Sequence, residues 1–162
     1  MSDTPLPSLA PHIDAETPAD AVAVEALVLA AFGPGRFAKT AERLRERAVI
    51  AAGFVARDGA DLLGSVRLWS ITVGGEPALF LGPIAVAAAN RKAGLGADLV
   101  QACLAFAADA GMGVLLVGDS PYFGRFGFEP AADVRVPGPA DARRVLWRGE
   151  TRPAGAVLPA AD

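Results

Sequence analysis

The sequence predicts an α/β (α+β) fold whose central sheet is mixed, mostly antiparallel, splayed at a parallel strand pair and flanked by helices. Three strand-like runs, at residues 50–57, 62–73 and 78–86, are separated only by short turns, which requires antiparallel pairing. A helix-period segment and the apolar run at 114–117 then follow. Because a strand, a helix and a fully apolar strand form a crossover unit, the last of these strands is expected to pair in parallel.

Composition limits the class of protein. The chain has 162 residues, of which 52% are hydrophobic and 20% charged, so we expect one domain (1–162) with a real core and loosely ordered ends at about 1–11 and 150–162. A net charge of −3 without a basic stripe argues against nucleic acid, and no apolar stretch approaches the roughly 20 residues of a membrane span. The first residues lack a basic leader and an apolar region, which predicts a cytoplasmic protein. One cysteine and one histidine predict neither a disulfide nor a Cys/His metal site.

Helix boundaries are marked by capping residues. Thr17 is placed to cap a helix that begins with Pro18 and carries Asp20 in its first turn, and this helix is expected to stop at Gly33. A second, short helix is expected from about Thr40.

The second half of the chain continues with a longer helix. Apolar residues recur at helical spacing from Leu95 until Gly111. After the strand at 114–117, residues 134–136 and 145–147 are expected to close the chain as a hairpin.

A glycine-rich turn follows the third strand and opens the long helix. Glycines there let an anion approach the unpaired N–H groups of the helix start, while basic side chains add positive charge. This predicts a phosphate cradle made by Arg91, Lys92, Ala93, Gly94, Leu95, Gly96 and Ala97. The dinucleotide fingerprint fails because Leu99 stands where it needs glycine, and the P-loop pattern is absent. Taken alone, such a turn is more often purely structural.

Gly82-Pro83 interrupts the strand that precedes this turn. Proline cannot donate to a ladder, so a bulge is expected here that splays the strand from its neighbour. Main-chain groups of Ile84, Ala85 and Val86 would then be free to bind an extended ligand whose phosphate end lies at the helix start. Coenzyme A has this shape.

Four segments in this order resemble the GNAT N-acetyltransferases, specifically their YhbS-like branch. They are Leu81-Gly82-Pro83-Ile84-Ala85-Val86, Arg91-x-x-Gly94-x-Gly96, Leu116-Val117-Gly118-Asp119 and Tyr122-Phe123-Gly124-Arg125-Phe126-Gly127-Phe128. The resemblance implies a GNAT fold, acetyl-CoA as donor, pyrophosphate bound by main-chain N–H groups of residues 91–97, and pantetheine along residues 84–86. No metal is implied.

The chain departs from the family at one catalytic position. Where the family commonly has a tyrosine that protonates the leaving thiolate, this chain has Phe123, and its tyrosine stands one residue earlier, at Tyr122. On a helical turn Tyr122 would point about 100° away from that position, so its hydroxyl would face the sheet or the acceptor pocket instead. Tyr122 is therefore either a displaced general acid or a packing residue. Asp119 either acts on the acceptor amine, by orienting it or by accepting its proton, or caps the short helix that follows. Cys103 is expected to pack in the core.

The sequence thus predicts an acetyl-CoA-dependent N-acetyltransferase in which an acceptor amine, of a small molecule or a peptide, attacks directly. The alternative from another class is a non-catalytic acyl-CoA-binding sensor of the same fold, and a third is an unrelated nucleotide-binding fold. The sequence leaves open whether the chain forms a homodimer.

Overall fold

The fold is described by a computed structural model for residues 12–32, 48–88, 94–137 and 141–160. Its strands are β1 (His12–Ala15), β2 (Val49–Asp58), β3 (Asp61–Val73), β4 (Glu76–Val86), β5 (Val114–Val117), β6 (Glu129–Pro130), β7 (Val134–Arg135), β8 (Val145–Arg148) and β9 (Gly155–Pro159). The helical elements within these ranges are η1 (Pro18–Asp20), α1 (Ala21–Phe32), α3 (Leu95–Ala110), α4 (Ser120–Gly124) and η4 (Ala142–Arg144).

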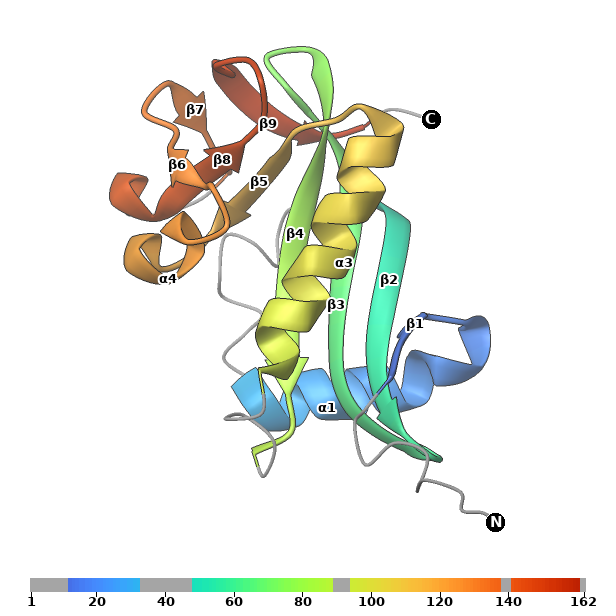
Figure 1. The fold of residues 1–162 in the computed structure, drawn as a ribbon. Helices are drawn as coiled ribbons and strands as arrows, with labels where there is room; N and C mark the ends of the chain where they lie inside the picture. The colour runs from blue at the N-terminus through green and yellow to red at the C-terminus, as the bar shows by residue number, and fades with distance from the viewer. Residues whose placement is uncertain (1–11, 33–47, 89–93, 138–140, 161–162) are drawn as a thin grey trace.

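The sheet is mixed, as the sequence predicts. Strands run in the order β1-β2-β3-β4-β5-β8-β6, and β9 pairs with both β3 and β7. All pairs from β1 to β4 are antiparallel, whereas β4 and β5 are parallel across the crossover helix α3 (Figure 1). The long strands β2, β3 and β4 form the body of the sheet, and β5, β6 and β8 lie together beside it (Figure 1).

The start of α1 is fixed by the predicted cap. The Thr17 and Asp20 side chains satisfy the first main-chain groups reciprocally, as a capping box. The Arg57 guanidinium of β2 donates hydrogen bonds to both oxygens of the same Asp20 carboxylate, at 2.8 and 2.7 Å. The Asp20 side chain therefore ties the helix entry to the sheet as well as capping it.

The two faces of the sheet are covered differently. On one face, α3 packs Leu99, Val100 and Cys103 against Val66 and Leu68 of β3. On the opposite face, α1 covers the lower part of the sheet. The upper part of that face is covered by the segments from β6 to β9, which bury Trp69, Ile71, Phe80, Leu115, Ala131, Val134, Val145 and Val157 together.

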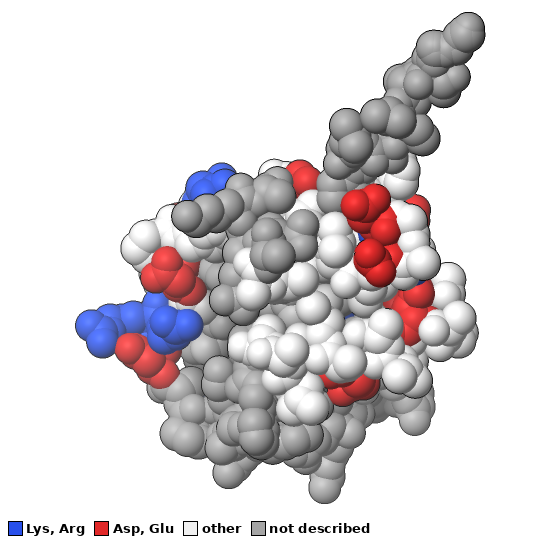
Figure 2. Space-filling model, turned by 90° about the horizontal axis from the view of Figure 1, so that it is seen from below, with Lys and Arg blue, Asp and Glu red and all other residues white. Residues whose placement is uncertain are grey.

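Seen from below, the molecule shows uncharged surface bordered by several acidic side chains, with basic atoms confined to one side (Figure 2). Helix α1 lies at this end (Figure 1) and exposes Val22 and Leu29. Among the described helices, none is long and apolar enough to cross a membrane.

Two expectations about the C-terminal part are wrong. Residues 134–136 and 145–147 do not form a hairpin: β7 pairs in parallel with β9, whereas β8 pairs with β5 and β6. The apolar Val145 and Leu146 find buried partners along β5, an edge that a local hairpin would leave unpaired. Residues 155–159 are not a loose end, because β9 pairs with Ile71–Val73 of β3. The helix expected from about Thr40 and the N-terminal residues 1–11 lie outside the described residues.

Candidate functional site

The parallel strands β4 and β5 separate along their length. Only Leu79 with Val114 and Phe80 with Leu115 are paired. Beyond Phe80, β4 continues for six residues without a partner on this side in the described part of the chain, while β5 continues along β8. The predicted splay is therefore present, and it opens one edge of β4.

The expected bulge lies at the point of separation. In the β3–β4 ladder, Val66 opposes Ile84 and Leu68 opposes Leu81, so Gly82 and Pro83 together face Arg67. The peptide bond between Gly82 and Pro83 is cis. At φ +145°, Gly82 has a main-chain conformation that residues with a side chain rarely adopt, which explains glycine here.

Register determines which main-chain groups face the open edge. The Ala87 N–H donates to the Leu63 carbonyl across the ladder at 2.8 Å. Because antiparallel pairs alternate, Ala85 also directs its N–H and C=O toward β3. Ile84 and Val86 therefore direct theirs toward the opening, so that two of the three predicted residues have main-chain groups with no ladder partner there among the described residues.

Helix α3 begins beside this edge. Gly94 precedes it at φ +80°, and the first intrahelical bond runs from Asp98 N–H to Gly94 C=O at 3.1 Å. The N–H groups of Leu95, Gly96 and Ala97 consequently have no intrahelical acceptor. A Cβ on Gly94 would meet no described atom within 4 Å, so the space beside it is open. Of the predicted cradle, Arg91, Lys92 and Ala93 lie outside the described residues.

Tyr122 reaches this same helix start. Its hydroxyl oxygen lies 3.5 Å from the position that a Cβ on Gly96 would take. The Arg125 guanidinium carbon lies 5.0 Å from the centre of the Tyr122 ring and 5.3 Å from that of Phe126, so the cation covers both. The hydroxyl thus lies at the first turn of α3.

Phe123, like Tyr122, is partly buried against the core. Its ring packs at the edge of Phe128, with centroids 5.9 Å apart, and lies so close to Gly118 that a Cβ there would collide with it. Asp119 caps α4 by accepting the Tyr122 N–H at 3.1 Å. The capping alternative for Asp119 is therefore confirmed, and through this cap the carboxylate fixes the main chain that carries Tyr122.

An ion-pair cluster of Arg67, Glu16 and Glu25 lies opposite the bulge. Sequence reasoning missed Glu16. Arg67 donates to both carboxylate oxygens of Glu16, at 3.1 and 2.8 Å, and to Glu25 at 3.3 Å. Hydrogen bonding to the Glu16 carboxylate raises the pKa of the Arg67 guanidinium. Glu16 fits because Gly53, which faces Arg67 in β2, has no side chain to occupy the same space.

Cys103 is a packing residue, as expected. It is fully buried between α3 and the sheet. Burial raises the pKa of its thiol to about 12, so the thiolate needed for nucleophilic attack does not form near neutral pH.

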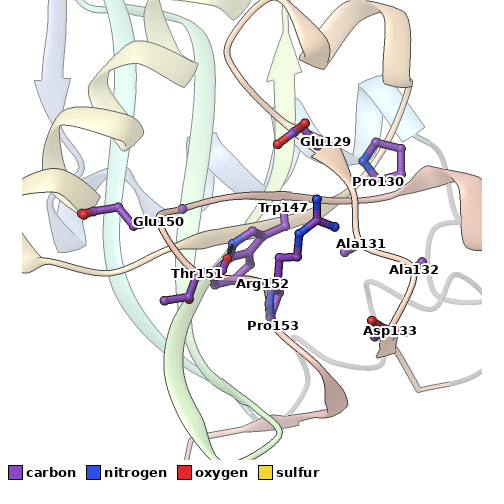
Figure 3. Close-up of a pocket in the computed structure, with 11 residues that line it drawn as sticks. Glu129, Pro130, Ala131, Ala132, Asp133, Trp147, Glu150, Thr151, Arg152 and Pro153 are labelled. Carbon is purple, nitrogen blue, oxygen red and sulfur yellow. Dashed lines mark hydrogen bonds between the residues drawn. The ribbon is translucent and has the colours of Figure 1, made fainter.

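A separate cavity of about 300 Å³ lies between β6 and the connection from β8 to β9 (Figure 3). Trp147 and Arg152 lie side by side in it, with Glu129 and Asp133 at its margin (Figure 3). None of the predicted site residues lines this cavity. It is therefore distinct from the opening between β4 and β5.

Comparison with known proteins gives consistent relatives. The model of the acetyltransferase (GNAT) family matches residues 22–128. A protein of Escherichia coli K12 called "uncharacterized N-acetyltransferase YhbS" is 35% identical over 124 residues, which cover 74% of either chain. The crystal structure of Escherichia coli YhbS in complex with CoA has a TM-score of 0.81 at 29% identity, covering 99% of this chain and 93% of that one. A GNAT acetyltransferase of Brucella melitensis, solved with acetyl-CoA, has a TM-score of 0.64 at 28% identity over 84% and 94% of the two chains.

Proposed function

The chain belongs to the acetyltransferase (GNAT) family and is an N-acetyltransferase, and we propose that it transfers the acetyl group of acetyl-CoA directly to an acceptor amine. The acceptor is the amine of a small molecule or a peptide. The observation that carries the proposal is the open edge of β4 beside the start of α3. Two solved relatives support it, since one was crystallised with CoA and the other with acetyl-CoA.

The residues at this edge fit the coenzyme. An extended chain with amide groups needs main-chain partners in a row, which Ile84 and Val86 offer on the side away from β3. A pyrophosphate needs convergent N–H donors, which Gly96 and its neighbours offer at the start of α3. Arg91, Lys92, Ala93 and Gly94 complete the proposed phosphate-binding segment.

Bound acetyl-CoA supplies an acetyl thioester, so that an amine can form the new C–N bond as the C–S bond breaks. The thiolate leaves, and the proton that the amine nitrogen loses balances the one that the thiolate takes up to give free CoA. The protein's contribution is mainly alignment. Ile84 and Val86 orient the donor, and their N–H groups can stabilise negative charge that develops on a carbonyl oxygen nearby. Tyr122, the only tyrosine of the chain, is the side chain proposed to donate to the coenzyme from α4. Asp119 holds it in place through the cap.

The test is a turnover assay with acetyl-CoA and panels of small amines and peptides. Release of free CoA is followed with a chromogenic thiol reagent. The protein does not interfere, because its single cysteine is the buried Cys103. We expect CoA release that depends on the amine, together with the acetylated product in mass spectrometry.

Two results would contradict parts of the proposal. Tight coenzyme binding with no transfer to any amine would favour a sensor over an enzyme. Thermal stabilisation by ATP or NAD, with none by CoA or acetyl-CoA, would contradict the coenzyme site itself, since a ligand that binds the folded state raises its stability.

A further inference from the structure

The bulge in β4 is held by a side chain of the neighbouring strand. The Trp69 indole Nε1–H donates to the carbonyl oxygen of Gly82 at 2.6 Å, and this hydrogen bond is buried. Gly82 is the first of the two bulged residues. A buried carbonyl without a donor is costly, and a bulge disrupts the ladder that would normally supply one. The indole N–H therefore satisfies a main-chain group where the sheet is irregular.

A second interaction supports the same indole. Arg67, the residue opposite the bulge, has its guanidinium carbon 6.0 Å from the centre of the Trp69 ring. The bidentate pair with Glu16 fixes that guanidinium, and both side chains are nearly buried, at 12% and 11% exposed. Glu16 in turn is anchored through its N–H to the Gly53 carbonyl at 2.8 Å. A chain of contacts thus runs from the entry of α1 through β3 to the bulge.

The position of the bulge decides what the open edge presents. Ile84 and Val86 follow Gly82 by two and four residues, so a shift of one residue in the register would turn their main-chain groups toward β3. We propose that Trp69 is a positioning residue of the coenzyme site, whose indole N–H fixes the bulge and thereby the direction of the Ile84 and Val86 main-chain groups. This rests on the proposed function, because it assigns the edge to acetyl-CoA.

Packing alone does not account for tryptophan here. The ring contributes to the core with Phe80 and Leu115, which phenylalanine would also do. Tryptophan differs from phenylalanine in its larger ring and in its N–H, and the N–H is the group that points at the bulge. The chain also contains a matched control, because Trp147 donates its Nε1–H to the main-chain carbonyl of Thr151 at 2.8 Å.

The test compares Trp69→Phe with Trp147→Phe. Calorimetry gives the dissociation constant for acetyl-CoA, and NMR gives the amide shifts of Ile84 and Val86 in the coenzyme-free proteins. For Trp69→Phe we expect about tenfold weaker binding, the value of one hydrogen bond, with shifted amides at both residues. For Trp147→Phe we expect binding within about twofold of wild type. Wild-type affinity and unshifted amides in Trp69→Phe would overturn the proposal.

The coenzyme-free amide shifts keep this inference separate from the proposed function. If the wild type bound no acetyl-CoA while Trp69→Phe still moved the Ile84 and Val86 amides, the coenzyme site would be refuted and the fixing of the bulge retained. A second measurement guards against a variant that fails to fold. In Trp147→Phe the remaining indole resonance belongs to Trp69, and we expect it to shift on titration with acetyl-CoA. An unchanged resonance at saturation would contradict the positioning role.

Discussion

The Tyr122 hydroxyl lies over Gly96, in the first turn of α3, while the ring of the next residue, Phe123, packs against Phe128 and beside Gly118. The Tyr122 and Phe123 rings meet edge to face, with centroids 4.9 Å apart and an angle of 89°, and both pack against the same core cluster. The hydroxyl is therefore near the proposed phosphate-binding N–H groups. This location favours a role in holding the coenzyme over protonation of the thiolate.

Replacement of Tyr122 by phenylalanine separates these two roles. If the hydroxyl holds the coenzyme, Tyr122→Phe should raise KM for acetyl-CoA several-fold and change kcat by less than about tenfold, as expected for one lost hydrogen bond. Steady-state kinetics with acetyl-CoA varied give both values. A fall in kcat by about 10² to 10⁴ with KM unchanged would instead identify Tyr122 as the general acid.

The ion pair of Arg57 with Asp20 should make stability depend on pH. Hydrogen bonds from Arg57, and then from the Thr17 N–H, hold the pKa of the Asp20 carboxyl well below its ordinary value of 3.8. The stabilisation is thus fully present above pH 3.8 and is lost as the pH falls toward the lowered value. Asp20→Asn should lower Tm near neutral pH, and its difference from wild type should shrink on acidification.

Asp14 supplies the control for this prediction. It also contacts Arg57, at 3.2 Å, but its side chain is half exposed, so Asp14→Asn should change Tm far less. If the two substitutions lowered Tm equally near neutral pH, the capping box and the bidentate geometry of Asp20 would not contribute to stability.

The buried thiol gives a direct test of packing at α3. The raised pKa of Cys103, about 12, and its full burial predict no reaction of the native protein with a thiol reagent near neutral pH. One thiol per chain should react after denaturation in guanidinium chloride, since the chain has one cysteine. Rapid labelling of the native protein would show that α3 opens from the sheet.

Much of the fold could be predicted because its signals are local. The Thr17 cap, the turns at residues 58–61 and 74–77, and the glycine that ends α3 each act within a few residues. The parallel pairing of β4 with β5 followed from the crossover. By contrast, the sequence of β9 is that of a Pro/Ala-rich tail, and its pairing with β3 and β7 makes it a strand. A segment in which apolar and polar residues do not alternate gives no local signal for a strand.

The bulge and the splay of β4 could be predicted from the sequence, whereas the side-chain contacts between strands that support the bulge were missed. Gly82-Pro83 predicted the bulge, because glycine followed by proline is unusual inside a strand. The roles of Glu16 and Trp69 could not be predicted, since their hydrogen-bond partners lie 51 and 13 residues away in the sequence. Counting pairs back from the turn at 74–75 would have placed Arg67 opposite Gly82, which was the one available signal.

A buried serine offers a stabilising substitution. Ser65 of β3 is 1% exposed, and its hydroxyl has no hydrogen-bond partner among the described residues. An unpaired buried hydroxyl costs stability, so Ser65→Ala should raise the free energy of unfolding by about 1 kcal/mol in denaturant titration. Ser70→Ala on the same strand, at a half-buried position, should stay within about 0.5 kcal/mol of wild type. A loss of stability in Ser65→Ala would show that the hydroxyl is paired.

A negative charge at the start of α3 should abolish coenzyme binding without harming the fold. Gly96→Glu places a carboxylate among free helix N–H groups, which stabilises the helix, but it repels the phosphates proposed to bind there. We expect the dissociation constant for acetyl-CoA to rise on the order of 100-fold, with Tm unchanged or higher. Gln101→Glu makes the same charge change at an exposed position of α3 and should bind within about twofold of wild type. Gly96→Ala separates charge from bulk, because its Cβ makes only an ordinary contact with the Tyr122 hydroxyl. Wild-type affinity in Gly96→Glu would place the phosphates elsewhere.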